Sequence, residues 1–372
     1  MKKTGFIIAA AAFLAIFGMS GRAMAAYSCS GSQQSYNNNC AQEQSSNAYT
    51  SPQLVGVASR QLAGLISARI ESFRASAGGL KTLALNEQGK LGKGPAIELG
   101  TGRGAGSGGN KLGVWADASW SDYKDKNAST KADGNIITGA FGIDYQADPN
   151  VVIGLAAGYE NTDINTTFNR GNLKADGYTL APYAVFKLDD MFSVDVNGGY
   201  TWLKYDVDRT TVSSTVGGFT GTKSTGSFDA NRLFGSLNVN ADYATDGWLL
   251  SGTLGTLYAS ESQDAYTESA GTVRQGASYD VGRAIVGGKV GYDIDGIVPY
   301  VKGSYEYDYS RENITVQTGD TKAANDDDRF VLGAGLSIAP VNGVSGGLEF
   351  TSVQGATSVT NYTVNGTLRV DF

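Results

Sequence analysis

The residue types that most often carry enzyme chemistry are sparse in this chain. It contains no histidine, which excludes histidine-based acid–base catalysis, a Ser-His-Asp triad and His/Cys metal sites. The segment GTGRGAGSGG at 100–109 lacks the Lys-Ser/Thr of a phosphate-binding loop and is interpreted as a flexible linker. The acidic runs Asp189-Asp190 and Asp326-Asp327-Asp328 could attract Ca²⁺, but such runs in loops are usually only solvated. We therefore expect no enzymatic activity, no cofactor and no metal site.

Charged residues recur instead within strand-like segments, always at the parity opposite to a row of apolar residues. They are Asp117, Asp195, Arg232, Arg283, Lys289, Lys302, Glu306, Glu349, Arg369 and Asp371. Because successive side chains of a strand point to opposite faces, each of these strands would have one wet face and one apolar face. Lipid outside and water inside satisfy both faces, so we predict that these charges line the lumen of a transmembrane β-barrel.

The strand pattern is clearest at the end of the chain, from Val359 to Phe372. Tyr362, Val364 and Leu368 share one parity, whereas Asn365 and Arg369 take the other. Similar alternating segments fill residues 112–372, and they add up to twelve strands. The sequence thus predicts an all-β, twelve-stranded antiparallel transmembrane barrel.

Connections between these segments alternate in length. Tight turns are expected at Asp148-Pro149-Asn150, Asp189-Asp190, Thr245-Asp246-Gly247, Asp295-Gly296 and Val341-Asn342-Gly343. Long polar loops are expected at 124–134, 162–174, 207–229, 262–277 and 311–328. Short turns on one side and long loops on the other are typical of bacterial outer-membrane barrels. A soluble β-sandwich or solenoid is the alternative, but it explains neither this asymmetry nor the aromatic residues at both ends of the apolar rows.

The N-terminus indicates export. Lys2 and Lys3 precede an apolar run, and Ala23-Met24-Ala25 resembles a cleavage site, so residues 1–25 are predicted to be a signal peptide rather than a retained signal-anchor helix. Cys29 and Cys40 are expected to form a disulfide in an exported chain, with lipidation of Cys29 as the alternative. The net charge of −7 argues against a nucleic-acid partner.

Residues 26–50 are polar, and residues 51–77 have the apolar spacing of a helix. A helix of about 37 Å could thread the barrel, where Arg60, Arg69 and Arg74 could pair with lumen acids; a periplasmic stalk or coiled coil is the alternative. Residues 78–111 form a flexible linker to the barrel.

The order of these parts resembles the translocator β-domain of monomeric autotransporters over about residues 50–372. The similar stretches are ASRQLAGLISARIESFR at 58–74, GVWADASWSDY at 113–123, GYTLAPYAVFKLDDMFSVDVNGGYTW at 177–202, PYVKGSYEYDYSRE at 299–312 and NYTVNGTLRVDF at 361–372. The resemblance implies a helix inside the pore, a terminal Phe372 read by the barrel-assembly machinery, and a passenger segment before the helix. Here residues 26–50 are too short for a catalytic passenger, so they would be a remnant or a small displayed tip.

The expected function is therefore an outer-membrane barrel of the translocator type that anchors or displays a very short N-terminal segment at the surface of a Gram-negative cell. Its partners would be outer-membrane lipid, the assembly machinery and periplasmic chaperones, and it would be a monomer. A porin-like channel and an adhesin that acts through its long loops remain the alternatives.

Overall fold

The computed structural model describes residues 46–77, 81–82, 97–98, 112–210, 221–311, 327–341, 344–357 and 359–371. One long helix, α3 (Ser46–Ala77), precedes the barrel strands. The barrel strands are β3 (Leu112–Asp125), β4 (Ala132–Asp148), β5 (Val151–Thr166), β6 (Gly171–Lys187), β7 (Phe192–Thr210), β8 (Lys223–Thr245), β9 (Trp248–Gln263), β12 (Ala277–Tyr292), β13 (Ile297–Arg311), β14 (Asp328–Val341), β15 (Val344–Gln354) and β16 (Val359–Asp371). A two-stranded sheet of β1 (Lys81–Thr82) with β2 (Ile97–Glu98), a short hairpin of β10 (Tyr266–Thr267) with β11 (Val273–Arg274), and the 3₁₀ turn η1 (Thr167–Asn169) complete the described elements.

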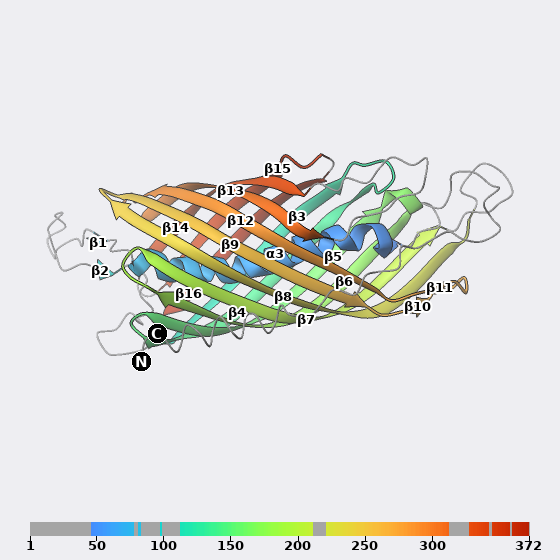
Figure 1. Ribbon diagram of the computed structural model, residues 1–372, viewed down its shortest axis with the longest axis horizontal. Coiled ribbons are helices and arrows are strands. Elements are labelled where there is room, and N and C mark those ends of the chain that lie inside the picture. The colour runs from blue at the N-terminus through green and yellow to red at the C-terminus, as the bar shows by residue number, and fades with distance from the viewer. Residues whose placement is uncertain are drawn as a thin grey trace.

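The twelve long strands form one closed antiparallel barrel in which neighbours along the chain are neighbours in space. The last strand, β16, closes the ring by pairing with β3 from Asp371↔Gly113 to Val359↔Asp125. The predicted fold class is confirmed. Helix α3 runs lengthwise inside this cylinder (Figure 1).

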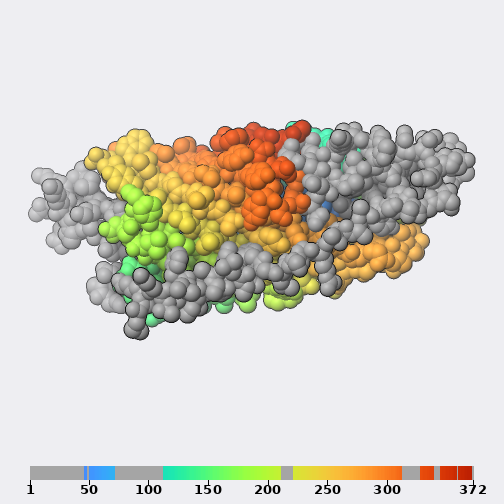
Figure 2. Space-filling model, viewed as in Figure 1, coloured from blue at the N-terminus to red at the C-terminus, as the bar shows by residue number. Residues whose placement is uncertain are grey.

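The apolar parity of each strand faces outward, as the alternation predicted. Phe141, Tyr178, Leu254, Leu336 and Leu368 are all exposed large side chains on the outer surface. Where the strands are visible in Figure 2, their side chains pack into a continuous outer surface. Such an apolar exterior requires hydrocarbon around it.

Tight turns join the strands at one end of the barrel. Asp246-Gly247 and Asp295-Gly296 each place two consecutive residues at positive φ, which matches the type I′ geometry favoured in two-residue hairpins. The connections at the opposite end are mostly longer, so that end is the outer one by the usual asymmetry of outer-membrane barrels.

Several strands extend further at the outer end than the sequence indicated. Segment 162–174 was expected to be a long loop, but β5 continues to Thr166 and β6 starts at Gly171; likewise β7 and β8 occupy much of 207–229. Where the strands extend beyond the membrane, the alternation of apolar and polar side chains is inverted, because water surrounds the barrel there and its interior is packed. Leu173 and Phe228 therefore point inward and are buried.

The helix also begins earlier than expected, at Ser46 rather than residue 51, so Pro52 lies within it instead of at its first turn. Polar side chains of the outer strand ends bind this first turn, as described below. Within the described residues, no helix combines the length and hydrophobicity needed to cross a lipid bilayer.

Candidate functional site

Helix α3 fills one side of the lumen, where it packs against β3–β9 and β12. Its buried apolar side chains include Leu62, Leu65, Ile66 and Ile70. Inward-pointing side chains of the strands surround them, namely Trp115, Ala156, Tyr183, Phe234, Leu257 and Val281. Fully burying an aliphatic side chain of this size contributes about 1.5–3 kcal/mol, so the helix is an integral part of the packed interior.

The first turn of α3 is held at the outer end of the barrel. The Ser46 hydroxyl lies 2.9 Å from the Thr166 hydroxyl and donates to the Asp208 carbonyl at 2.5 Å. Asn169 Nδ2 donates to the same Ser46 oxygen at 3.0 Å, and Asn47 Nδ2 donates to Gln263 Oε1 at 2.8 Å. The helix therefore runs from the outer end, at Ser46, toward the end with the tight turns.

The β10–β11 hairpin also contacts this first turn. The ring of Tyr266 stacks on Phe228 at 4.8 Å, and Phe228 stacks on Tyr205 at 4.9 Å. Tyr266 Oη also donates to Asn47 Oδ1 at 3.2 Å. An aromatic stack and a hydrogen bond thus connect the hairpin and the barrel wall to the helix.

A buried ion-pair cluster fixes the hairpin to β7. Glu268 accepts hydrogen bonds from Arg209 Nη2 and Arg274 Nε, both at 2.8 Å, and all three side chains are buried. Burial raises the pKa of the Glu268 carboxyl, but the hydrogen bonds and charges of the two arginines outweigh it and lower that pKa below its ordinary value. This cluster lies outside the membrane-spanning part of the barrel.

Ion pairs connect the body of the helix to the wall. Arg69 makes a bidentate pair with Asp144, with N–O distances of 2.6 and 2.8 Å, and each side chain is only 3 % exposed. Arg60 Nε lies 3.1 Å from Glu306, and Glu71 pairs with Lys289. The structure thus places two of the three predicted pore arginines against acids of the barrel.

Two further networks join barrel strands on the lumen side of the wall. Arg232 lies between Glu160 and Glu261, at 2.9 and 2.7 Å. Arg283 pairs with Asp308 at 2.5 Å and with Glu306 at 3.3 Å. Buried charges need partners, and these networks supply partners for two arginines and four acids in the interior. One of the four acids, Glu306, also binds Arg60 of the helix.

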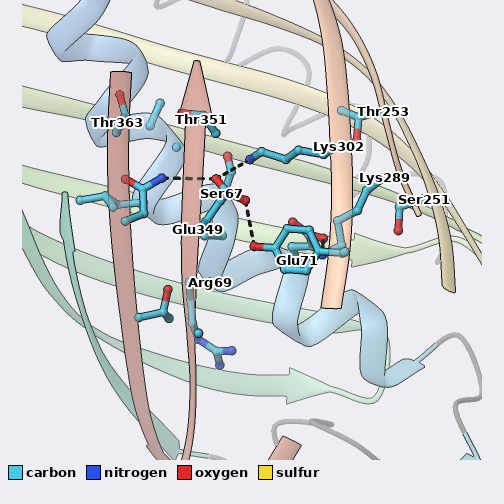
Figure 3. A pocket seen from close by; sticks show the side chains of 18 of the residues that line it. Ser67, Arg69, Glu71, Ser251, Thr253, Lys289, Lys302, Glu349, Thr351 and Thr363 are labelled. Atoms are coloured by element: carbon cyan, nitrogen blue, oxygen red, sulfur yellow. Dashed lines mark hydrogen bonds and ion pairs between the residues drawn. The ribbon is translucent and has the colours of Figure 1, made fainter. Parts of the chain in front are cut away.

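A cavity of about 490 Å³, lined by both polar and apolar side chains, lies beside α3 and is bounded largely by β12–β16. Lys302 and Glu349 lie in contact on its lining (Figure 3), with a Nζ–Oε1 distance of 2.6 Å. Tyr300 Oη also donates to Glu349, at 2.9 Å. Hydroxyl side chains such as Thr351 and Thr363 complete this face.

The remaining predicted lumen residues whose side chains the structure describes also point inward, whereas the side chain of Asp371 lies outside the described part. Asp195 is buried and accepts hydrogen bonds from Asn238 and Asn240, both at 2.7 Å. Asp117 is buried and lies across from Thr367 on β16, while Arg369 is buried and lines the cavity.

Sequence reasoning missed the partners of these charges. They are Asp144, Glu160, Glu261 and Asp308 in the lumen, and the Arg209–Glu268–Arg274 cluster at the outer mouth. The lumen acids share the inward parity of their strands, and that signal could have identified them.

Other predicted features lie outside the described residues. These are the signal peptide, Cys29, Cys40, most of the linker, Phe372 and the side chain of Arg74. Across the described part of the chain, no group of three or more Asp, Glu, Cys or His side chains could hold a metal ion.

Both the sequence and the fold of this chain are similar to those of known proteins. The family model described as autotransporter beta-domain matches residues 114–351. The solved translocator domain of autotransporter NalP from Neisseria meningitidis is similar with a TM-score of 0.59 and 17 % identity, over 70 % of this chain and 89 % of that one. The beta domain of the Bordetella autotransporter Brka gives 0.58 and 16 %, over 71 % and 100 %. No curated protein matches the sequence significantly.

Proposed function

This chain belongs to the autotransporter β-domain family, and we propose that its helix-filled barrel anchors and displays the short segment before Ser46 at the cell surface. The barrel itself is an outer-membrane protein of the translocator type from a Gram-negative bacterium. What is proposed is the role of the N-terminal segment.

The direction of α3 carries this proposal. Ser46 and Asn47 are bound by the outer strand ends, whereas Glu71 is bound by Lys289 toward the end with tight turns. A chain that enters the helix at Ser46 must therefore come from the outer mouth. The segment before it would lie outside the cell, with the helix as its tether.

The buried contacts of α3 also favour the function of a tether, and they argue against a wide-open porin. A diffusion porin needs a hydrated lumen, but here Leu62, Ile66 and Ile70 are almost fully buried against the wall. An adhesive function has no comparable support in the described residues.

Further expectations belong to the same proposal. The barrel would reach the membrane through periplasmic chaperones and the barrel-assembly machinery, which would read Phe372, and it would act as a monomer without enzymatic activity, cofactor or nucleic-acid partner. Phe372→Ser should then lower the amount of folded barrel in the membrane, measured by heat-modifiable gel mobility.

Labelling of intact cells tests the display. After mild reduction, a membrane-impermeant maleimide should label Cys29 and Cys40 in the wild type but not in a Cys29→Ser/Cys40→Ser control. Lysed cells give the total labelling possible. Protection of both cysteines in intact cells, with a correctly folded barrel, would refute display of this segment.

A further inference from the structure

A charge cluster of three arginines and two acids lies in the outer half of the lumen, between α3 and the outer ends of β13 and β14. Arg283 on β12 pairs with Asp308 and Glu306. Arg329 also pairs with Asp308, and the Nε atom of Arg60 on the helix lies 3.1 Å from Glu306. Each carboxylate therefore lies between two guanidinium groups, and the cluster has one positive charge in excess.

This excess charge is buried. The side chains of Arg283, Glu306 and Asp308 are each at most 3 % exposed, and that of Arg329 is 15 % exposed. The cavity beside the cluster provides little compensation, because its lining includes apolar side chains such as Val57. An ion without a partner is strongly unfavourable in such surroundings relative to water. An anion bound beside the arginines would remove this cost.

The other described acids that line the same cavity are engaged elsewhere. Glu71 and Glu349 each pair with a lysine. Asp195 accepts hydrogen bonds from two asparagines of β8, and Asp242 lies near the end of β8 that leads into a tight turn. None of these four carboxylates is therefore available to neutralise the arginine cluster.

Two of the arginines have free donors. The Nε–Glu306 contact is the only polar contact of Arg60 in the described part of the structure, and its side chain is 27 % exposed. Arg329 binds Asp308 through Nη2, which leaves its Nη1 group for a ligand. Arg60, Arg283 and Arg329 all line the cavity, whose volume of about 490 Å³ is ample for a small oxyanion.

We propose that Arg60 and Arg329 bind a small tetrahedral oxyanion, such as inorganic phosphate, and that Arg283 adds to the positive charge of the site. The planar guanidinium group has the geometry to donate two parallel hydrogen bonds to such an ion. The bound ion would join the helix to β14, a strand outside the surface on which α3 packs. Because the barrel wall is closed, the ion would come from water and not from a lipid headgroup. The site depends only on the barrel and α3, so its failure would leave the display of the N-terminal segment untouched.

Isothermal titration of the full chain, folded in detergent in a phosphate-free buffer with NaCl, measures the site directly. Sodium phosphate should bind with one-site saturation. Arg60→Gln and Arg329→Gln should each weaken phosphate binding by about tenfold or more, because each removes charge-assisted donors. Lys124→Gln removes an exposed positive charge and is the matched control that should leave the affinity unchanged. Absence of saturable binding in wild type, or equal affinity in wild type and both arginine variants, would overturn the proposal.

Thermal unfolding, followed by heat-modifiable gel mobility, gives a second readout. Phosphate should raise the unfolding temperature of wild type relative to NaCl of equal ionic strength, because a ligand that binds only the folded state stabilises it. This rise should be lost in Arg329→Gln. Arg329→Lys keeps the charge without the planar fork, and it covers the case in which Arg329→Gln fails to fold. It should retain only a smaller rise, and a rise as large as that of wild type in the folded Arg329 variants would equally overturn the site.

Discussion

The Arg69–Asp144 pair should be the strongest single polar contact that keeps α3 in the pore. Both side chains are 3 % exposed, and the two N–O contacts measure 2.6 and 2.8 Å. Removing one partner of such a pair leaves the other charge buried and costs about 3–5 kcal/mol. This free energy should destabilise the state in which the helix is bound in the lumen. Asp144→Asn or Arg69→Met should therefore raise the population of molecules with a displaced helix by roughly two to three and a half orders of magnitude.

Native-state proteolysis measures that population. Trypsin cleavage of α3 at Arg60 should require displacement of the helix, and the cleavage rate follows the open population when closing is faster than cleavage. Folded barrels carrying each single substitution, the double substitution and wild type are compared in detergent. Lys124→Met is the matched control, because the Lys124–Asp122 pair has a similar 2.9 Å distance on the exposed surface, where such pairs contribute about 0–1 kcal/mol.

The double variant separates pairing from general damage. Arg69→Met/Asp144→Asn removes both charges and leaves no uncompensated charge. The double variant should therefore be cleaved more slowly than expected from adding the free-energy changes of the two single variants. A cleavage rate of Asp144→Asn equal to wild type, or strictly additive effects in the double variant, would refute a buried pair that retains the helix.

Two further outcomes follow from other contacts. Folding lowers the pKa of Glu268, so the contribution of its carboxylate to stability is fully present above the ordinary pKa of 4.5 and is lost as the pH falls through the lowered folded value. Hydrogen exchange of the β10–β11 hairpin should therefore become faster in acid. Glu268→Gln should remove that acid dependence. Gly142→Val should destabilise the barrel by about 1–3 kcal/mol, because a built Cβ lies 2.4 Å from Trp115, whereas Gly139→Val on the same strand meets nothing within 4 Å; unfolding in urea compares the two.

Local patterns in the sequence determined the barrel. The alternation from Val359 to Asp371 and the turn pairs Asp246-Gly247 and Asp295-Gly296 are properties of short stretches of chain, and the structure has the strand and the positive φ angles there. Because strands that follow one another in the chain usually pair with each other, their order in space follows from their order in the chain. The inward parity of charged residues could also be predicted, since it depends only on which solvent each face meets.

Pairing across the lumen was decided by the tertiary structure. Inward parity does not tell whether Arg69 meets Asp144 or Asp117, because that depends on the depth and rotation of α3 within the barrel. The same holds for the start of the helix at Ser46, whose partners Thr166 and Asp208 are distant in the chain, and for the inverted pattern of Leu173 and Phe228 beyond the membrane. The off-centre position of the helix, and hence the cavity beside it, results from the sum of many side-chain contacts from most of the strands, and no local pattern contains that sum.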